Sequence, residues 1–277
     1  MERAELDAAS LEITTAIGCR VNCRFCPQET LRRRYVGPGR KRVLDPSDFA
    51  RYLEKVPSSV SIHFSGMSEP WLNPACTAML LLAAQRGHAV SVYSTLLGMS
   101  GEDFERIRGL KFDHFVTHLP DAEGNARIPV SAEYLKLLQR VLDADLDVAA
   151  ARHASCHGTL APEVAAILGG RLVVADRMLN RAGNLAEGAS VARRLRGSIA
   201  CRRAGRLLNR NVLLPDGTVV LCCMDYGLQH VLGNLADSTY GELLAGAEAR
   251  RVRAAMDDDT LPLLCRGCTV ARPMRSG

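Results

Sequence analysis

Hydrophobic residues in the first two thirds of the chain follow two alternating patterns. Short apolar runs predict strands, and longer stretches with apolar residues three or four positions apart predict helices between them. The expected strands lie at residues 11–17, 60–64, 89–93, 114–118, 147–152 and 171–176, and the expected helices at residues 46–55, 73–86, 100–110 and 131–144. Strands that alternate with helices are typical of parallel βα units, so the pattern predicts an α/β fold with six units.

The last third of the chain has a different pattern. Pro215-Asp216-Gly217 separates two runs rich in β-branched residues, at residues 211–214 and 218–221. Pro, Asp and Gly favour the backbone angles of a tight turn. We therefore expect a β-hairpin whose second strand ends at Cys222.

Composition narrows the class of protein. Of the 277 residues, 47% are hydrophobic, which is enough to fill the core of one barrel with or without a small appendage. The first residues contain no apolar signal segment, and the longest apolar stretch, residues 75–84, is too short to span a bilayer. We therefore expect a soluble, cytoplasmic protein without membrane contact.

Charge and cysteine content narrow the class of protein further. The net charge is +5 and no long basic tract is interleaved with aromatic residues, so nucleic-acid binding is not indicated. Ten cysteines in a reducing compartment indicate metal binding or catalysis rather than disulfides. Eight of them fall in two groups, at residues 19–26 and 201–268.

The first group, Cys19, Cys23 and Cys26, follows the first expected strand with the spacing C-x3-C-x2-C. Three thiolates can hold a cubic iron-sulfur cluster but leave one iron without a protein ligand, whereas a structural cluster has four cysteines. A metal site keeps an open position when a substrate must bind there. A zinc loop is the alternative, although zinc favours paired C-x2-C knuckles.

With Phe25 directly before the last cysteine, this loop resembles the cluster-binding signature of the radical S-adenosylmethionine (SAM) enzymes. The resemblance implies a 4Fe-4S cluster whose open iron binds SAM, and a 5'-deoxyadenosyl radical that abstracts a hydrogen atom from a substrate. It also implies a partial, TIM-like (β/α)6 barrel with an open side for the substrate. Phe25 is then expected beside the cofactor.

The turn at residues 65–70, Ser-Gly-Met-Ser-Glu-Pro, resembles the Gly-Gly-Glu-Pro motif that holds the SAM amino group in this family. The Glu-Pro pair matches, but the two residues before it are not glycines, and Gly66 lies one position earlier. The resemblance implies cofactor contacts from Gly66, Ser68 and Glu69. Thr95, at the end of the third strand, is expected either near the SAM ribose or carboxylate or as a helix cap.

Polar residues end the fourth and fifth expected strands, on the edge where barrel enzymes hold their active sites. His118 ends the fourth strand, and Arg152, His153, Cys156 and His157 end or follow the fifth. Histidine suits proton transfer near neutral pH, and an arginine can bind a substrate carboxylate or hydroxyl. We interpret His118, Arg152 and Cys156 as candidate catalytic residues, with a polar capping loop as the alternative.

The second cysteine group resembles the auxiliary-cluster domain, called a twitch domain, that follows the barrel in some radical SAM enzymes. Its longer relative, the SPASM domain, holds two clusters and needs more cysteines than remain here. The resemblance implies one further 4Fe-4S cluster on Cys201, Cys222, Cys265 and Cys268. Cys223 is an alternative to Cys222 because neighbouring strand residues face opposite ways, and structural zinc is an alternative to the cluster. The expected domains are a barrel at residues 1–190 and a twitch/SPASM-like domain at residues 191–277.

The layout is similar to that of the small twitch-domain dehydrogenases that act on aminocyclitols. It implies a radical SAM oxidoreductase that dehydrogenates a sugar or aminocyclitol hydroxyl, with the auxiliary cluster as electron acceptor and a flavodoxin- or ferredoxin-type donor. The enzymatic alternatives are an epimerase or dehydratase of such substrates and a peptide-modifying radical SAM enzyme. Outside enzymology, the alternative is a zinc-dependent nucleic-acid binder that uses the arginines at residues 193–210.

Overall fold

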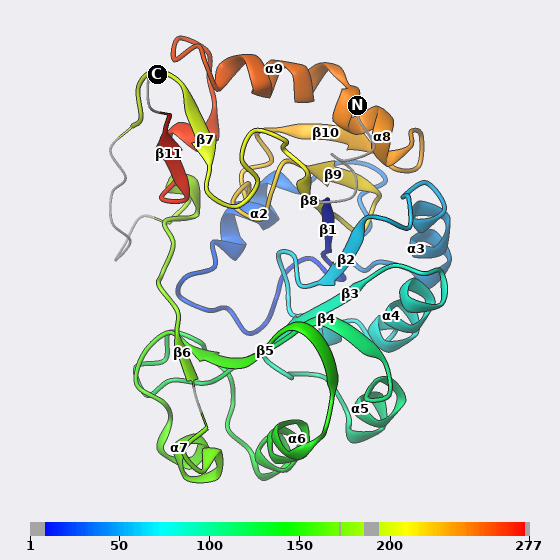
Figure 1. Ribbon diagram of the computed structural model, residues 1–277, viewed down its shortest axis with the longest axis vertical. Coiled ribbons are helices and arrows are strands. Elements are labelled where there is room, and N and C mark those ends of the chain that lie inside the picture. The colour runs from blue at the N-terminus through cyan, green and yellow to red at the C-terminus, as the bar shows by residue number, and fades with distance from the viewer. Residues whose placement is uncertain (1–8, 172, 186–193, 275–277) are drawn as a thin grey trace.

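The computed structural model describes residues 9–171, 173–185 and 194–274. Within them, six neighbouring strands run parallel in chain order. These strands are β1 (Ser10–Ile13), β2 (Ser61–Phe64), β3 (Val90–Ser94), β4 (Lys111–His118), β5 (Asp147–Cys156) and β6 (Val173–Ala175). The helices between them are α2 (Gln28–Arg34), α3 (Pro46–Leu53), α4 (Cys76–Gln85), α5 (Gly101–Ile107), α6 (Ala132–Asp143) and α7 (Pro162–Leu168). Helices α3 to α7 cover the outer face of the curved sheet (Figure 1), which confirms the expected partial (β/α)6 barrel.

Local capping fixes where several of these helices begin. The Asp45 carboxylate accepts a hydrogen bond from the N–H of Ser47 at 2.8 Å, and Pro46 takes the first helical position of α3. Ser100 caps α5 and Ser131 caps α6 in the same way. Because β1 to β6 pair in parallel, their carboxyl ends lie at the same edge of the sheet.

The C-terminal part contains the expected hairpin, and the hairpin joins the barrel. β8 (Arg210–Leu213) pairs antiparallel with β9 (Thr218–Val220), and β9 pairs with β10 (Val231–Asn234). β8 also pairs in parallel with β1, which extends the barrel sheet to nine strands in the order β10-β9-β8-β1-β2-β3-β4-β5-β6. The sequence pattern predicts the hairpin but not this attachment. The hairpin therefore brings the second cysteine group beside the barrel.

The remaining elements cover the hairpin. β7 (Ile199–Cys201) pairs with β11 (Ala271–Pro273), while α8 (Tyr240–Ala245) and α9 (Ala247–Ala255) lie above β10 (Figure 1). Short 3-10 helices occur at Pro70–Leu72, Arg181–Gly183 and Leu264–Gly267. The expected domain boundary at residues 190–191 lies outside the described residues.

The largest core cluster joins the barrel to part of the C-terminal segment, since Leu213, Val219 and Tyr240 belong to it. Ile13, Phe64 and Val92 belong to the larger cluster of buried side chains, between the barrel sheet and its helices. Val252 and Met256 of the α9 region belong to a smaller cluster, which also contains Cys268. None of the described helices is both long enough and apolar enough to cross a membrane.

Candidate active site

The three cysteines of the first group come together in the loop between β1 and α2. Gly18 and Asn22 have positive φ angles of 91° and 48°, which allow the loop to turn back toward the barrel. Burial and the nearby Cys26 and Cys19 thiols raise the pKa of Cys23 to about 12. Neighbouring thiols that oppose each other's ionisation become stable thiolates when a metal supplies positive charge. The arrangement of the three thiols is therefore more favourable with a metal cluster bound than as three thiolates without a metal.

Gln28, the first residue of α2, holds this loop in shape. Its Oε1 accepts a hydrogen bond from the N–H of Cys19 at 3.2 Å. Its Nε2 donates to the carbonyl of Met67 at 2.7 Å and lies 3.4 Å from the Cys26 sulfur. The same sulfur lies 2.9 Å from the hydroxyl of Tyr226, which belongs to the C-terminal part. Both parts of the chain thus contact Cys26.

The turn after β2 packs against the cysteine loop. Gly66 has a φ of +68°, and a Cβ atom there would lie 2.5 Å from Thr14 Oγ1 and 2.9 Å from its backbone nitrogen. The N–H of Glu69 lies 3.5 Å from the Cys19 sulfur, and Ser68 Oγ accepts a backbone hydrogen bond at 3.4 Å. The turn expected to contact SAM therefore lies beside the loop expected to hold the cluster.

The Glu69 carboxylate is engaged by protein donors. Its Oε1 accepts from Ser94 Oγ at 2.6 Å and from the N–H of Trp71 at 3.4 Å. Its Oε2 accepts from both the N–H and the hydroxyl of Thr95 at 2.7 Å. The sequence predicts separate cofactor contacts for Glu69 and Thr95, whereas the structure pairs them. Because the four acceptor positions are used, an ammonium group could bind this carboxylate only by displacing a protein donor.

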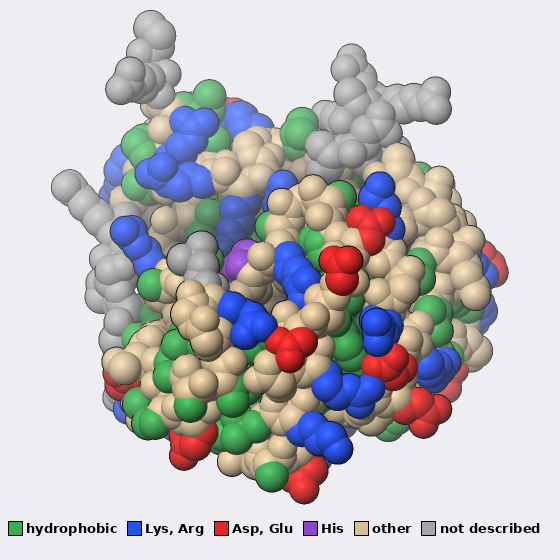
Figure 2. All heavy atoms as spheres, turned by 60° about the horizontal axis from the view of Figure 1, so that its bottom comes forward, with side chains coloured by type: hydrophobic (Ala, Val, Ile, Leu, Met, Phe, Trp, Pro, Cys, Tyr) green, Lys and Arg blue, Asp and Glu red, His purple; other side chains and the backbone are tan. Residues whose placement is uncertain are grey.

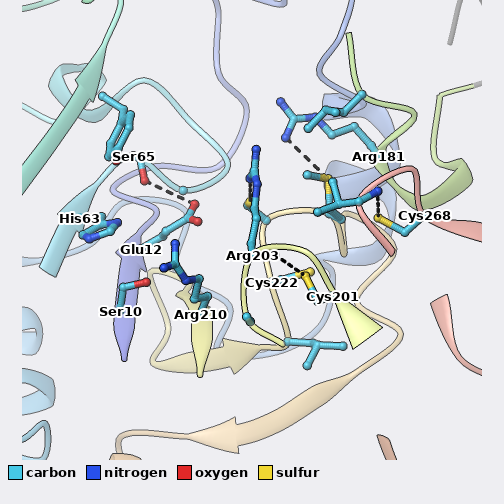
Figure 3. Close-up of a pocket in the computed structure, with 18 of the residues that line it drawn as sticks. Ser10, Glu12, His63, Ser65, Arg181, Cys201, Arg203, Arg210, Cys222 and Cys268 are labelled. Atoms are coloured by element: carbon cyan, nitrogen blue, oxygen red, sulfur yellow. Dashed lines mark hydrogen bonds between the residues drawn. The ribbon is translucent and has the colours of Figure 1, made fainter. Parts of the chain in front are cut away.

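A cavity of about 590 Å³ lies between the barrel and the C-terminal strands. Glu12, His63 and Tyr93 line it from the barrel, and Cys201 and Arg203 are among the residues that line it from the other side. Figure 3 shows Arg203 between Glu12 and the cysteines of the second group. The space-filling view shows a hollow with a histidine at its base and lysine or arginine side chains around it (Figure 2). Cysteines of the second group thus line the cavity directly, and the first cysteine loop borders it through Phe25.

The floor of this cavity is formed by residues that the sequence analysis does not single out. Glu12 lies 3.3 Å from the hydroxyl of Ser65, and burial raises its pKa while Cys223 and Arg203 lower it. Burial and the nearby His114 lower the pKa of His63 to about 4. Glu12 is the one charged residue in the apolar run at residues 11–17, and that exception is the signal that could have identified it.

A hydrogen-bonded network lies at the rim, where β4, β5 and β6 end. Ser155 Oγ lies 2.7 Å from His118 Nδ1, which lies 3.6 Å from the Asp176 carboxylate. Burial opposes ionisation of Asp176, but hydrogen bonds from His118 and Ser155 lower its pKa to about 2. His157 joins this rim, with its ring 3.8 Å from that of Phe25 in the cysteine loop. His118 and Phe25 both line the cavity.

Two of the expected catalytic residues are not brought into the cavity. Strand β5 continues to Cys156, so side chains there alternate between the two faces of the sheet. Arg152 points outward and donates hydrogen bonds to the carbonyls of Val141 and Leu142 in α6, at 2.8 and 3.3 Å. Cys156 lies four residues after Arg152, so it points to the same face of the sheet, and it is 4% exposed. Arg152 is therefore not placed for the expected substrate contact, whereas its neighbour His153 lines the cavity.

The second cysteine group also converges. Burial, Cys223 and Cys265 raise the pKa of Cys222. Burial, Cys268 and Cys201 raise the pKa of Cys265 to about 12. Burial and Glu12 raise the pKa of Cys223 to about 12, so Cys223 lies toward the barrel. The structure thus places Cys222, rather than Cys223, beside Cys265.

Buried polar side chains position the C-x2-C turn of this group. His230 Nε2 accepts a hydrogen bond from the N–H of Leu264 at 3.1 Å, and its Nδ1 lies 2.8 Å from Glu248. Arg266 is 1% exposed and donates to three backbone carbonyls, at 3.2, 2.9 and 2.7 Å. These contacts tie the C-x2-C turn to His230 and to the carbonyls of Leu195, Gly197 and Ala255.

Comparison with protein-family models matches residues 201–269 to SPASM, an iron-sulfur cluster-binding domain. Residues 201–269 form a SPASM domain. The match spans the whole second cysteine group, so this domain provides an iron-sulfur site rather than the zinc alternative. A comparison with curated proteins finds no significant match for the chain.

Solved structures share the fold over almost the whole chain. BtrN in complex with AdoMet and 2-DOIA has a TM-score of 0.63 and 15% identity, over 94% of this chain and 92% of BtrN. SuiB from Streptococcus suis, bound to the precursor peptide SuiA, has a TM-score of 0.55 and 11% identity, over 95% of this chain and 70% of SuiB. anSMEcpe with bound AdoMet has a TM-score of 0.54 and 13% identity, over 94% of this chain and 83% of anSMEcpe. With the SPASM domain, this likeness confirms the resemblance to radical SAM enzymes that carry a twitch or SPASM domain.

Proposed function

We propose that this chain is a radical SAM enzyme that dehydrogenates a hydroxyl-bearing carbon of a sugar or aminocyclitol to a ketone. One observation carries the proposal: the cysteine loop through Phe25, the thiols of the SPASM domain and the His118 network all border the same cavity. Radical formation, proton removal and electron removal would therefore act on one substrate at one place.

The residues present fit the required cofactors. Cys19, Cys23 and Cys26 would hold a 4Fe-4S cluster with one open iron, and Cys201, Cys222, Cys265 and Cys268 would hold a second, fully ligated cluster. The SAM site would lie among Phe25, Gly66, Ser68, Glu69 and Thr95. When bound, these groups would supply the electron that cleaves SAM to the 5'-deoxyadenosyl radical, and the acceptor for the electron that leaves the substrate.

The rim network supplies the base. Asp176 is ionised at neutral pH because its pKa is about 2. It can accept a hydrogen bond from Ser155, whose oxygen in turn accepts the Nδ1 proton of His118. With Nδ1 directed at Ser155, Nε2 is the ring nitrogen of His118 that would take the hydroxyl proton of the substrate. Loss of one hydrogen atom, one proton and one electron balances the oxidation of an alcohol to a ketone.

The cavity favours a small substrate with several polar groups. Its volume is in the range of small-molecule sites, and Glu12, Ser65 and His63 offer a carboxylate, a hydroxyl and an imidazole along one wall. The small-molecule complex of BtrN also has a higher TM-score than the peptide complex of SuiB. A flavodoxin- or ferredoxin-type protein would provide the external electron.

Anaerobic reconstitution with iron and sulfide tests the cofactors. We expect about eight irons per chain. Cys26→Ala should lower this to about four and abolish SAM cleavage, whereas Cys76→Ala, at a buried cysteine outside both groups, should change neither result. A wild-type protein that binds zinc in place of iron would refute the proposal.

Product analysis tests the reaction. Reconstituted protein is incubated with SAM, a reductant and panels of aminocyclitols and peptides in deuterated water. We expect 5'-deoxyadenosine and a ketone, two electrons more oxidised than the aminocyclitol and without deuterium on the reacting carbon. His118→Gln should lower ketone formation by at least about 100-fold, the usual contribution of a general base. A modified peptide in place of the ketone would overturn the substrate assignment.

Epimerisation is the second candidate, because one free thiol lines the cavity. An epimerase needs a donor that returns a hydrogen atom to the substrate radical, and Cys223 lies toward Glu12 on the cavity wall. Cys156 and Cys76 are not among the residues that line it. If the enzyme is an epimerase, the product in deuterated water carries one carbon-bound deuterium, and Cys223→Ser loses that product while it still cleaves SAM. A dehydratase would instead yield a product that has lost water.

A further inference from the structure

The two cysteine groups are joined by one short segment of the SPASM domain. Tyr226 lies four residues after Cys222, and the N–H of Asp225 donates to the carbonyl of Cys222 at 3.0 Å, which closes the turn between them. The Tyr226 ring is 1% exposed, and its hydroxyl lies 2.9 Å from the sulfur of Cys26. One turn thus carries both Cys222, a thiol of the second group, and Tyr226, a hydrogen-bond partner of the first group.

The direction of this hydrogen bond follows from the chemistry of the sulfur. A thiolate cannot donate, and a phenol is protonated at neutral pH, so the Tyr226 hydroxyl must donate when Cys26 is a metal-bound thiolate. Gln28 Nε2 lies 3.4 Å from the same sulfur. The Cys19 sulfur has backbone donors, from Val21 and from Glu69, the latter at 3.5 Å. The Cys26 sulfur therefore has the stronger set of donors.

Arg181 holds the tyrosine in place. Its guanidinium carbon lies 5.8 Å from the centre of the Tyr226 ring, and its Nε donates to the carbonyl of Phe25 at 3.1 Å. Its Nη1 lies 4.0 Å from the sulfur of Met224, within the same turn. One buried cation therefore contacts the cysteine loop and the SPASM turn together.

We propose that Tyr226 is a positioning residue that couples the two cysteine sites: its hydroxyl donates to the Cys26 thiolate and raises the reduction potential of the cluster there. The hydrogen bond is held by the turn that carries Cys222, so it depends on whether the SPASM site is filled. Hydrogen bonds to cluster sulfurs stabilise the reduced, more negative state. This inference rests on the proposed function, since it requires a cluster on Cys19, Cys23 and Cys26.

The reconstituted full chain allows a matched test. Tyr226→Phe removes only the hydroxyl. Tyr240→Phe removes a hydroxyl that is equally buried in the C-terminal part but donates to Asn211 Oδ1 at 2.7 Å rather than to a sulfur. In redox titrations followed by electron paramagnetic resonance, Tyr226→Phe should shift the SAM-site cluster to a more negative potential. Tyr240→Phe should leave it at the wild-type value.

The coupling between the two cysteine sites is tested by removing cluster ligands from the SPASM domain. Cys265→Ala with Cys268→Ala should shift the remaining cluster in the same direction as Tyr226→Phe, and adding Tyr226→Phe to that variant should shift it little further. Gln28→Leu, which removes the other side-chain donor, should give a shift of the same sign and keeps the test available if Tyr226→Phe folds poorly. Resonance Raman spectra should show a change in the Fe–S(Cys) stretch for Tyr226→Phe.

Failure of this inference and failure of the proposed function give different results. A wild-type protein that assembles no cluster on Cys19, Cys23 and Cys26 contradicts the proposed function itself. A cluster that forms normally but keeps its potential and its Raman spectrum in Tyr226→Phe overturns the role of Tyr226 and leaves the proposed function standing. Fully additive shifts in the combined variant overturn the coupling between the sites.

Discussion

The Glu69 carboxylate accepts two hydrogen bonds from Thr95, one from its N–H and one from its hydroxyl, both at 2.7 Å. Glu69 follows β2 and Thr95 follows β3, so the pair ties two neighbouring strand ends together. The N–H of Glu69 in turn lies 3.5 Å from the Cys19 sulfur. The position of the cysteine loop therefore depends on a buried carboxylate that does not face solvent.

Glu69→Gln tests this dependence. The substitution keeps the shape but replaces one acceptor oxygen with an amide donor, which must then face Thr95 or Ser94. Hydrogen bonds to a buried charged group contribute about 1.5–3 kcal/mol, so we expect the free energy of unfolding to fall by about 2 kcal/mol and SAM affinity to fall roughly tenfold. Chemical denaturation and equilibrium SAM binding measure the two effects.

The chain offers a matched control for that substitution. Glu242 Oε2 accepts from both the N–H and the hydroxyl of Thr239, at 2.7 and 2.8 Å, in an exposed helix cap. Glu242→Gln makes the same chemical change at a similar pair of bonds far from the cysteines, and it should leave SAM affinity unchanged. Equal loss of affinity in both variants would contradict the role given to Glu69.

Neighbouring positions on β5 should respond in opposite ways to mutation. Arg152→Met removes the bonds to the carbonyls of Val141 and Leu142, so we expect a loss of about 1 kcal/mol of stability with product formation nearly unchanged. His153→Leu removes a polar side chain from the cavity wall and should lower product formation roughly tenfold with little loss of stability. Steady-state kinetics and thermal unfolding of the two variants, run side by side, decide between them. The reverse pattern would return Arg152 to the active site.

Strand β5 also shows how far sequence patterns reach. Helix caps such as Ser100 and Ser131 are predictable because their partners lie three residues away. The end of a strand has no such local signal, and the apolar run on β5 stops at Arg152 although the strand continues to Cys156. The sequence therefore predicts a loop after Arg152. In a loop, the alternation typical of a strand cannot indicate which side chains point into the barrel. For this reason the sequence predicts the correct edge of the barrel for the polar residues, but it selects Arg152, whose side chain points outward.

Contacts between distant segments are beyond the reach of sequence patterns. The cysteine spacings indicate both metal sites, since each set of ligands has a recognisable motif. The contact between Tyr226 and Cys26 spans 200 residues, and that between Arg181 and Phe25 spans 156. The contact of Tyr226 follows the parallel pairing of β8 with β1, which brings the hairpin beside the cysteine loop. No local periodicity encodes that pairing, because a hairpin can form with or without a third strand beside it.

His63 should make stability depend on pH. Burial lowers its pKa to about 4 in the folded protein, from an ordinary value of 6.5, so the unfolded chain binds more protons between these values. Stability is therefore complete above pH 6.5 and falls as the pH decreases toward 4. Between pH 7.5 and 5.5 we expect a loss of about 1.3 kcal/mol from this group.

Urea unfolding of the reconstituted protein at the two pH values measures that loss. His63→Phe should reduce the difference between pH 7.5 and 5.5 by about 1.3 kcal/mol. Tyr93→Phe alters the neighbouring ring, 5.8 Å away, without removing a group that titrates in this range, and should keep the wild-type difference. An unchanged pH dependence in His63→Phe would show that folding does not lower the pKa of His63.

The adjacent cysteines in the turn after β9 should have separate roles. Cys222 lies beside Cys265, whereas Cys223 lies toward Glu12 and the barrel, so only Cys222 is placed to join the ligands of the SPASM domain. Cys222→Ala should therefore lower the iron content from about eight to about four per chain, and Cys223→Ala should leave it at about eight. Iron analysis with electron paramagnetic resonance of the reduced protein separates the two sites, since the signal of the SAM-site cluster should persist in both variants. Loss of iron in Cys223→Ala alone would reverse the assignment, and it would also remove the free thiol on which epimerisation depends.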